Sequence, residues 1–247
     1  MSHAHGNTRP RRFAIGMGLV VLLAGLVLAP VGCGCSETTP TTSSVTLPAS
    51  TTTTVVQSPF PDVSVGHYYY AQIVDLATRG VVGGFTDGTF RPDARVTRQQ
   101  FAKMIVLAAG YPVSEDDVCT FEDVQKSGAG SLYPDNYVAV CASRGITTGK
   151  TSTDFGPEDY LTRAQLITMV ARDAGLSEPP SDFVPPFPDF SVAHYPWARK
   201  AHFSGLLDGL REFEPEYKGV YDFWAYATRG EACVLLYNLM ERQSAGG

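Results

Sequence analysis

Apolar residues recur at helical spacing in pairs of short stretches, and the pair occurs three times along the chain. In the first stretch, residues 70–77 place apolar side chains at positions i, i+3, i+4 and i+7, which predicts a helix with one buried face. Gly80 follows where a left-handed C-terminal cap is expected, and Gly145 and Gly205 hold the matching places in the other copies. A glycine-containing loop then leads to the second helix of each pair.

The second helix of each pair begins with the tetrad Thr-Arg-x-(Gln/Glu). The three tetrads are Thr97–Gln100, Thr162–Gln165 and Thr228–Glu231, at a period of roughly 65 residues. A Thr at the N-cap with Gln or Glu three residues later predicts a capping box, in which each side chain accepts a hydrogen bond from a backbone N–H at the other position. One face of each following helix is apolar and must be buried.

This repetition predicts the architecture of the folded part. One pair of short helices cannot bury both apolar faces, so the three pairs are expected to pack together as a single all-α domain of about 185 residues. The predicted repeats span residues 60–113, 119–176 and 187–242. The third is irregular, as terminal repeats often are, because about six extra residues within 211–218 lengthen its loop.

The N-terminal part of the chain is of a different kind. A basic leader and an uncharged apolar run over residues 13–31 indicate an export signal or a membrane anchor within residues 1–35. The sequence before Cys33 resembles a lipoprotein signal, in which that cysteine is acylated, but a proline replaces the usual aliphatic residue three places earlier. Acylation, ordinary cleavage and a retained helix therefore stay open. Residues 36–59 are rich in Thr, Ser and Pro, which predicts a disordered tether.

Export makes the cysteines interpretable, since thiols outside the cytoplasm tend to be oxidised. We predict a disulfide between Cys119 and Cys141. Cys119 lies two residues before Phe121 at the start of the second repeat, and Cys141 lies on the first helix of that repeat. The alternative is that Cys141, aligned with Leu76 of the first copy, is a small buried apolar residue. Cys233 is unpaired in this prediction. The cysteines lack metal-ligand spacing, so neither a metal nor a cofactor is expected.

Capping does not explain the arginine of each tetrad. A cation in the first turn of a helix is disfavoured by the macrodipole by about 0.3 to 1 kcal/mol, yet Arg98, Arg163 and Arg229 all stand there. A compensating anion is therefore expected. It can be a ligand held by free helix N–H groups and the guanidinium, or an internal carboxylate in a structural ion pair. The internal carboxylates considered are Asp62, Asp123 and Asp189.

These motifs resemble the S-layer homology domain. In the first repeat they are Phe-x-Asp-Val, His67-Tyr68 before a helix, a loop Gly-Val-Val-x-Gly-Phe-x-Asp-Gly-Thr-Phe-x-Pro, and Thr-Arg-x-x. The second repeat is a good match, and the third is recognisable by Phe187-Pro188-Asp189 and its tetrad. The similarity covers residues 60–242.

The resemblance implies a pseudo-trimeric spindle whose grooves between repeats bind secondary cell-wall polymers without a covalent bond. In that family the ligand is often held through a pyruvate-ketal carboxylate on an amino sugar. The arginine of the tetrad faces the ligand, which implies this role for Arg98, Arg163 and Arg229. A loop glycine allows the sugar to approach closely, and the matching residues are Gly84, Gly149 and Gly209.

Two departures from the family pattern bear on the grooves. Gln100 and Gln165 replace the family's glutamate, which keeps the cap but removes a negative charge beside an arginine. The lengthened third loop carries three glutamates within residues 211–218, whose charge should repel an anionic ligand near Arg229. The third groove is therefore predicted to be the weakest.

The sequence favours a binding module over an enzyme. It has no nucleophile elbow, zinc motif or Ser-His-Asp candidate, so no catalytic residue is assigned. The predicted function is extracytoplasmic attachment to an anionic wall polysaccharide, with an N-terminal attachment to the membrane. An exported hydrolase or a protein-interaction module is the alternative. A net charge of −6 argues against a nucleic-acid partner. Aromatic residues that could stack on sugars are Tyr68, Tyr133, Tyr195 and Trp197.

Overall fold

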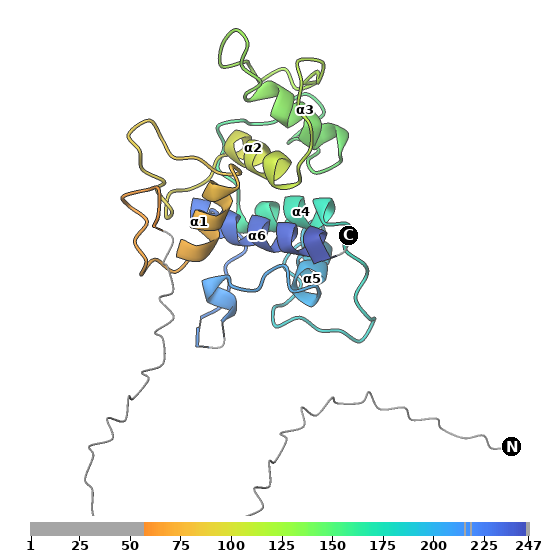
Figure 1. The fold of residues 1–247 in the computed structure, drawn as a ribbon. Coiled ribbons are helices and arrows are strands. Elements are labelled where there is room, and N and C mark those ends of the chain that lie inside the picture. Colours follow the sequence, from red (N-terminus) through yellow and green to blue (C-terminus); the bar gives the residue numbers. More distant parts are fainter. Residues whose placement is uncertain (1–56, 215, 218, 246–247) are drawn as a thin grey trace, which may run out of the picture. The chain divides into compact units, whose positions relative to one another are not determined.

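The computed structural model describes residues 57–245, except residues 215 and 218. This part of the chain is all-α, as predicted, and contains no β-strand (Figure 1). The helices are α1 (Tyr70–Thr78), α2 (Arg98–Ala108), α3 (Asp135–Ser143), α4 (Arg163–Asp173), α5 (Tyr195–Phe203) and α6 (Arg229–Ala245), with a short 3-10 helix η1 (Arg211–Phe213). The predicted export signal or anchor, Cys33 and most of the tether lie outside the described residues.

The helix ends follow the local sequence signals. Gly80, Gly145 and Gly205 have φ angles of 72°, 72° and 77°, which confirms the predicted left-handed caps after α1, α3 and α5. Complete capping boxes begin α2 and α4. At α6 the N–H of Thr228 donates to Glu231 Oε2 at 2.8 Å, and the N–H of Glu231 donates to Thr228 Oγ1 at 3.2 Å. All three predicted capping boxes are confirmed.

The helices pack mainly between repeats. α2 packs against α3, α4 against α5, and α6 against α1, so that the second helix of one repeat contacts the first helix of another. The contact of α6 with α1 joins the last repeat to the first (Figure 1). α6 also contacts α2 and α4. Its N-terminal half, Arg229–Leu236, is buried on every side, which explains why it lacks a single apolar face.

Three equivalent apolar residues, which we call the central ring, join the repeats through backbone hydrogen bonds. The N–H of Val96 donates to Ala227 O at 3.0 Å, that of Leu161 to Val96 O at 3.1 Å, and that of Ala227 to Leu161 O at 2.9 Å. All three side chains are fully buried. Each repeat thus donates to one neighbour and accepts from the other, which holds the three repeats in one unit.

One hydrophobic cluster extends through all three repeats.

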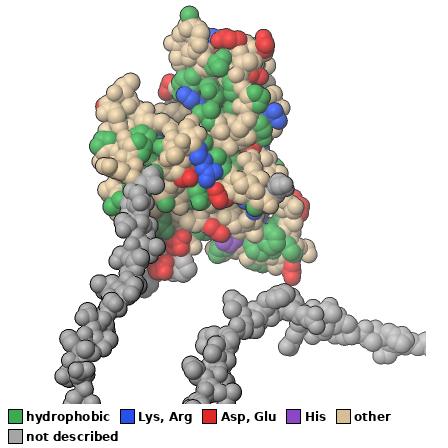
Figure 2. Space-filling model, viewed as in Figure 1, with side chains coloured by type: hydrophobic (Ala, Val, Ile, Leu, Met, Phe, Trp, Pro, Cys, Tyr) green, Lys and Arg blue, Asp and Glu red, His purple; other side chains and the backbone are tan. Residues whose placement is uncertain are grey.

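Within the described part of the chain, no helix combines the length and apolar character needed to span a bilayer. On the face shown in Figure 2, acidic and basic side chains form small groups among apolar ones. The charge available to a ligand must therefore be judged groove by groove.

Candidate functional site: three grooves between repeats

Two of the tetrad arginines reach into the loop of another repeat. Arg98 Nε donates to Phe155 O at 2.6 Å, and Arg229 Nε donates to Phe90 O at 2.8 Å. Arg229 Nη2 also donates to Gly83 O at 2.9 Å. Each guanidinium carbon lies 4.5 Å from the ring centroid of the same phenylalanine. Both arginines are only 6% exposed, so they tie the repeats together from the interior.

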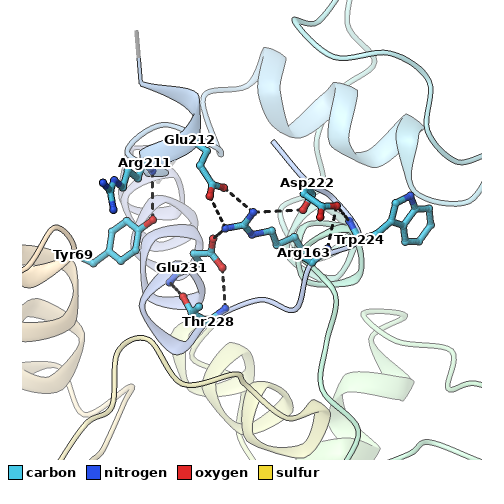
Figure 3. A network of polar contacts seen from close by, with 9 residues as sticks. Tyr69, Arg163, Arg211, Glu212, Asp222, Trp224, Thr228 and Glu231 are labelled. Atoms are coloured by element: carbon cyan, nitrogen blue, oxygen red, sulfur yellow. Dashed lines mark hydrogen bonds and ion pairs between the residues drawn. The ribbon is translucent and has the colours of Figure 1, made fainter. Parts of the chain in front are cut away.

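Arg163 makes the corresponding contact with the third repeat and also pairs with two carboxylates (Figure 3). Its Nη1 lies 3.5 Å from Asp222 O and 2.7 Å from a Glu212 oxygen, and its Nη2 lies 2.5 Å from a Glu231 oxygen. Burial acts to lower the pKa of Arg163, but the hydrogen bonds to Glu231 and Glu212 outweigh burial and raise it. Its charge is neutralised within the protein.

This contact overturns one expectation about the third loop. Glu212 was expected to act near Arg229, but it lies against Arg163. The reason is that each arginine enters the loop of the next repeat around the central ring, so the third loop meets the arginine of the second repeat. In the groove that contains Arg163, the guanidinium is therefore already paired with carboxylates of the protein.

Arg98 and Arg229 have no such partner. Among the described residues, neither forms an ion pair with a carboxylate, and their hydrogen bonds go to carbonyl oxygens. Burial lowers the pKa of both guanidinium groups. Asp159 and Asp123 act on Arg98 only as more distant charges that oppose this shift. A buried cation without a neighbouring carboxylate favours the approach of an anion.

The N–H groups that begin the second helices are already occupied. The N–H of Arg98 donates to Asp159 O at 2.9 Å, and that of Gln99 to Pro157 O at 3.0 Å. α4 and α6 show the same pattern, with Arg163 donating to Ala225 O and Arg229 to Ala94 O, each at 2.9 Å. These groups are therefore not free to bind an anion, which corrects the expectation from sequence. An anion in the grooves must therefore be held by groups other than these helix N–H groups.

In the first two repeats the aspartate near the start of the repeat supports the loop backbone rather than the arginine. Asp62 accepts two loop N–H groups at 2.8 and 2.6 Å, and Asp123 accepts the equivalent pair at 2.8 and 2.7 Å. The donors are Phe90 and Arg91 for Asp62, and Phe155 and Gly156 for Asp123. Burial acts to raise the pKa of both carboxyls, but these N–H donors lower it. Asp189 instead accepts the N–H of Ser191 at 3.1 Å.

Three of the cavities between the repeats each contain a different tetrad arginine. Each combines that arginine with the loop and second helix of the next repeat and the N-terminal segment of the third. Groove A (240 Å³) is lined by Arg229, Val81–Phe85, Gln100, Lys103, Met104 and Tyr133. Groove B (390 Å³) is lined by Arg98, Thr147–Lys150, Gln165, Thr168, Met169, Arg172, Ala193 and His194. Groove C (720 Å³) is lined by Gly66–Tyr69, Asp93, Arg163, Arg211, Glu212, Thr228 and Glu231.

Comparison with known proteins identifies these repeats. Residues 59–102 and 120–167 match the model of the S-layer homology domain. The chain contains S-layer homology repeats. The matched segments correspond to the first and second repeats. The third repeat lies outside them, although α5 and α6 give it the same two-helix plan.

The relatives are much longer proteins. Over 119 residues, 48% of this chain and 13% of the relative, the chain is 29% identical to an S-layer protein of Bacillus licheniformis. Over 114 residues, 46% of this chain and 11% of the relative, it is 35% identical to an endoglucanase of Bacillus sp. strain KSM-635. It is 24% identical over 152 residues to a cellulosome-anchoring protein of Acetivibrio thermocellus, covering 60% of this chain and 32% of that protein.

The loop glycines of the first two S-layer homology repeats line grooves A and B. A Cβ on Gly84 would lie 2.9 Å from the Phe60 ring, and one on Gly149, where φ is 75°, would lie 2.5 Å from the Phe121 ring. Packing of the loop therefore requires both glycines, apart from any ligand. Gly209 has an equivalent φ of 80°, but it has more space and does not line groove C.

Grooves A and B contain basic residues that the sequence analysis missed. Lys103 joins Arg229 in groove A, and Arg172 and His194 join Arg98 in groove B. Burial and the nearby Arg172 lower the pKa of His194, which favours its neutral form. Lys103 and Arg172 lie one or two helical turns after the capping glutamine. Their position on that face of the helix could have identified them.

The four aromatic residues that were predicted to stack on sugars lie in different parts of the structure. Tyr133 lines groove A and Tyr68 lines groove C. Trp197 does not line any of the three grooves. The guanidinium carbon of Arg172 lies 5.5 Å from its ring centroid, and Lys200 Nζ lies 4.8 Å from it. Tyr195 packs against the core. Position relative to the repeat therefore identified two groove residues out of four.

The predicted disulfide is not formed in the structure. Cys119 and Cys141 are both free thiols. Cys141 is fully buried with its Sγ 3.5 Å from Ala102 O, and the equivalent Leu76 is also fully buried. Burial raises the pKa of Cys141, and it raises that of Cys233 to about 12. In this structure Cys141 is a packing residue between α2 and α3, which matches the alternative that the sequence left open.

Proposed function

We propose that this protein binds an anionic cell-wall polysaccharide through grooves A and B and so attaches itself to the bacterial envelope. One observation carries the proposal: Arg229 and Arg98 are 6% exposed cations without a carboxylate partner, each lining a cavity between repeats. The names of the relatives, S-layer protein and cellulosome-anchoring protein, support a role at the cell surface.

The two arginines retain hydrogen-bonding capacity for a ligand. A guanidinium has five N–H donors, of which Arg98 uses one on a carbonyl and Arg229 uses two. The remaining donors suit a carboxylate, which can accept two parallel hydrogen bonds from one guanidinium. A carboxylate on a sugar, such as a pyruvate ketal, is therefore the proposed anchor of the polymer.

Groove C takes no part in the proposed binding. Arg163 is already paired with Glu212 and Glu231, so a carboxylate ligand would have to displace two internal ones. The two binding grooves contain Gln100 and Gln165 at the position of Glu231. A glutamine caps its helix equally well and leaves the arginine of the preceding repeat unpaired.

The proposed architecture around these grooves is a pseudo-trimeric spindle centred on the central ring. The N-terminal segment, with its apolar run and Cys33, is proposed to fix the other end of the protein to the membrane. The protein would then join the membrane to the wall polymer, and the tether of residues 36–59 would separate the two attachment points.

Substitution of the exposed Lys103 and the half-buried Arg172 tests this function without opening the core. We predict that Lys103→Ala together with Arg172→Ala weakens binding of purified wall polysaccharide by at least about tenfold, or 1.4 kcal/mol. Lys126→Ala is the matched control, since Lys126 pairs with Glu115 away from the three grooves. The measurement is a calorimetric titration with protein-free polysaccharide. Equal affinity of the double variant and the wild type would refute the proposal.

A further inference from the structure

We propose that groove B continues into a second subsite, in which an uncharged sugar residue stacks on Tyr160 and Tyr226. This inference rests on the proposed polysaccharide function and extends it. The ligand of groove B would then be at least two consecutive sugar residues, with the carboxylate at Arg98 and a neutral residue beside it.

A neighbouring cavity provides the space. This cavity, which we call the outer subsite, has a volume of 380 Å³ and shares Arg98, Lys150 and Gln165 with groove B. Its remaining lining residues are Glu158, Asp159, Tyr160, Thr162 and Tyr226. Because three residues border both cavities, a chain of sugars can pass from one to the other without leaving the protein surface.

The two tyrosines form an aromatic corner, because their ring planes are inclined at 64° to each other. Tyr160 and Tyr226 are 46% and 47% exposed, and their ring centroids lie 5.7 Å apart. The guanidinium carbon of Arg95 lies 4.5 Å from the Tyr226 ring and 5.5 Å from the Tyr160 ring. Each tyrosine directly precedes a residue of the central ring, so its backbone is held by the contacts between repeats. Rings held in this way lose little conformational entropy when a ligand binds.

The polar groups of the outer subsite suit hydroxyl groups rather than a second anion. Glu158 and Asp159 line it together with Arg98 and Lys150, and Asp159 is paired with Lys150 at 2.6 Å. The lining therefore has no excess positive charge for a second anion, whereas its carboxylate oxygens can accept hydroxyl hydrogens. Gln165 Oε1 accepts the N–H of Thr162 at 3.0 Å. Its Nε2 group has no partner among the described residues and can donate to a hydroxyl. A ring with apolar C–H faces and hydroxyl edges, which is a neutral sugar, matches this combination.

This aromatic pair occurs beside groove B alone. The residue just before the central-ring residue is Arg95 in the first repeat, Tyr160 in the second and Tyr226 in the third. By the same order of repeats, groove A would have Arg95 with Tyr160, and groove C would have Tyr226 with Arg95. The outer subsite therefore predicts a difference between the two binding grooves, with the longer ligand held by groove B.

Affinity as a function of ligand length tests the second subsite. Wall polysaccharide released from protein-free sacculi is hydrolysed and sorted into single charged sugars and longer fragments. Both are titrated into the full chain carrying Lys103→Ala, which weakens groove A. We expect the added pair Tyr160→Ala and Tyr226→Ala to weaken binding of the longer fragments at least tenfold and to leave binding of the single sugar unchanged. The pair Tyr160→Phe and Tyr226→Phe should retain the affinity for the longer fragments.

Tyr68→Ala is the matched control, because Tyr68 is 49% exposed but lines groove C. Thermal unfolding followed by circular dichroism verifies that each variant is folded. If the double alanine variant binds longer fragments as tightly as its parent, the outer subsite does not exist, and the proposed function stands. If the parent binds neither fragment, both the subsite and the polysaccharide function are wrong.

Discussion

At the scale of single residues, the aspartate near the start of each of the first two repeats stabilises the loop on which the groove arginine depends. Asp123 accepts two N–H groups beside the carbonyl that receives Arg98. Burial opposes ionisation of Asp123, but the N–H donors prevail and lower its pKa below the usual value of an aspartate. Its carboxylate therefore contributes stability that is fully present above the unfolded pKa of about 3.9 and is lost as the pH falls through the folded pKa.

This behaviour gives a prediction for Asp123→Asn. At pH 7 the substitution should lower the free energy of unfolding by about 1–3 kcal/mol, because two N–H groups lose a charged acceptor. The difference from the wild type should shrink below about pH 4, where the wild-type carboxyl begins to take up its proton. Urea denaturation at several pH values measures both effects.

Asp189→Asn provides the comparison for Asp123→Asn. Asp189 accepts the N–H of Ser191 and does not hold the equivalent loop N–H pair, so its replacement should cost less stability at pH 7. Equal losses for the two variants would show that the hydrogen bonds to the loop N–H pair are not what stabilises the second repeat.

The glutamates of groove C allow a gain-of-function test at the same scale. Glu231→Gln introduces the glutamine that stands at the equivalent positions, Gln100 and Gln165, and keeps the helix cap. Combined with Glu212→Ala, it leaves Arg163 without either carboxylate. We expect calorimetry to show a third binding site for wall polysaccharide in addition to the two proposed here. A surface control is Glu241→Gln, which removes one of the two carboxylate partners of Arg79. An unchanged stoichiometry would mean that groove C is closed for a reason other than charge.

At the scale of elements, α6 has the largest structural role. It packs against α1 and also contacts α2 and α4. From its N-terminus, Arg229 donates to the first-repeat carbonyls of Phe90 and Gly83. The first repeat therefore depends on the last for both apolar burial and satisfied polar groups, so the three repeats are expected to fold as one cooperative unit.

Deletion of the third repeat tests this dependence. Without residues 187–247, α1 loses α6, α4 loses α5, and the central ring loses Ala227. Native domains are stable by only about 5–15 kcal/mol, so we expect the remaining two repeats to be largely unfolded. Circular dichroism and urea titration measure this. Deletion of residues 1–56 is the control and should leave the unfolding transition unchanged. A truncated protein with a cooperative transition like that of the full chain would contradict the closed arrangement.

At the scale of the whole molecule, three similar repeats produce three unequal grooves. Groove A and groove B have an unpaired arginine, whereas groove C has an arginine held by two carboxylates. Only groove B borders the tyrosine pair. The repeated backbone places a cavity at three equivalent positions, and the residues that line each one decide its size and what it can bind.

The sequence alone determined the helices, their caps and the all-α class. Those features depend on hydrogen bonds and apolar spacing within a few residues, as at Thr97 with Gln100 or at Gly80. The tertiary structure alone decided which repeat supplies each partner. It placed Glu212 against Arg163 rather than Arg229, occupied the helix N–H groups with carbonyls, and brought Tyr160 beside Tyr226. These contacts join residues far apart in the chain, and they depend on the order in which the repeats close around the central ring, which the local pattern of one repeat does not specify.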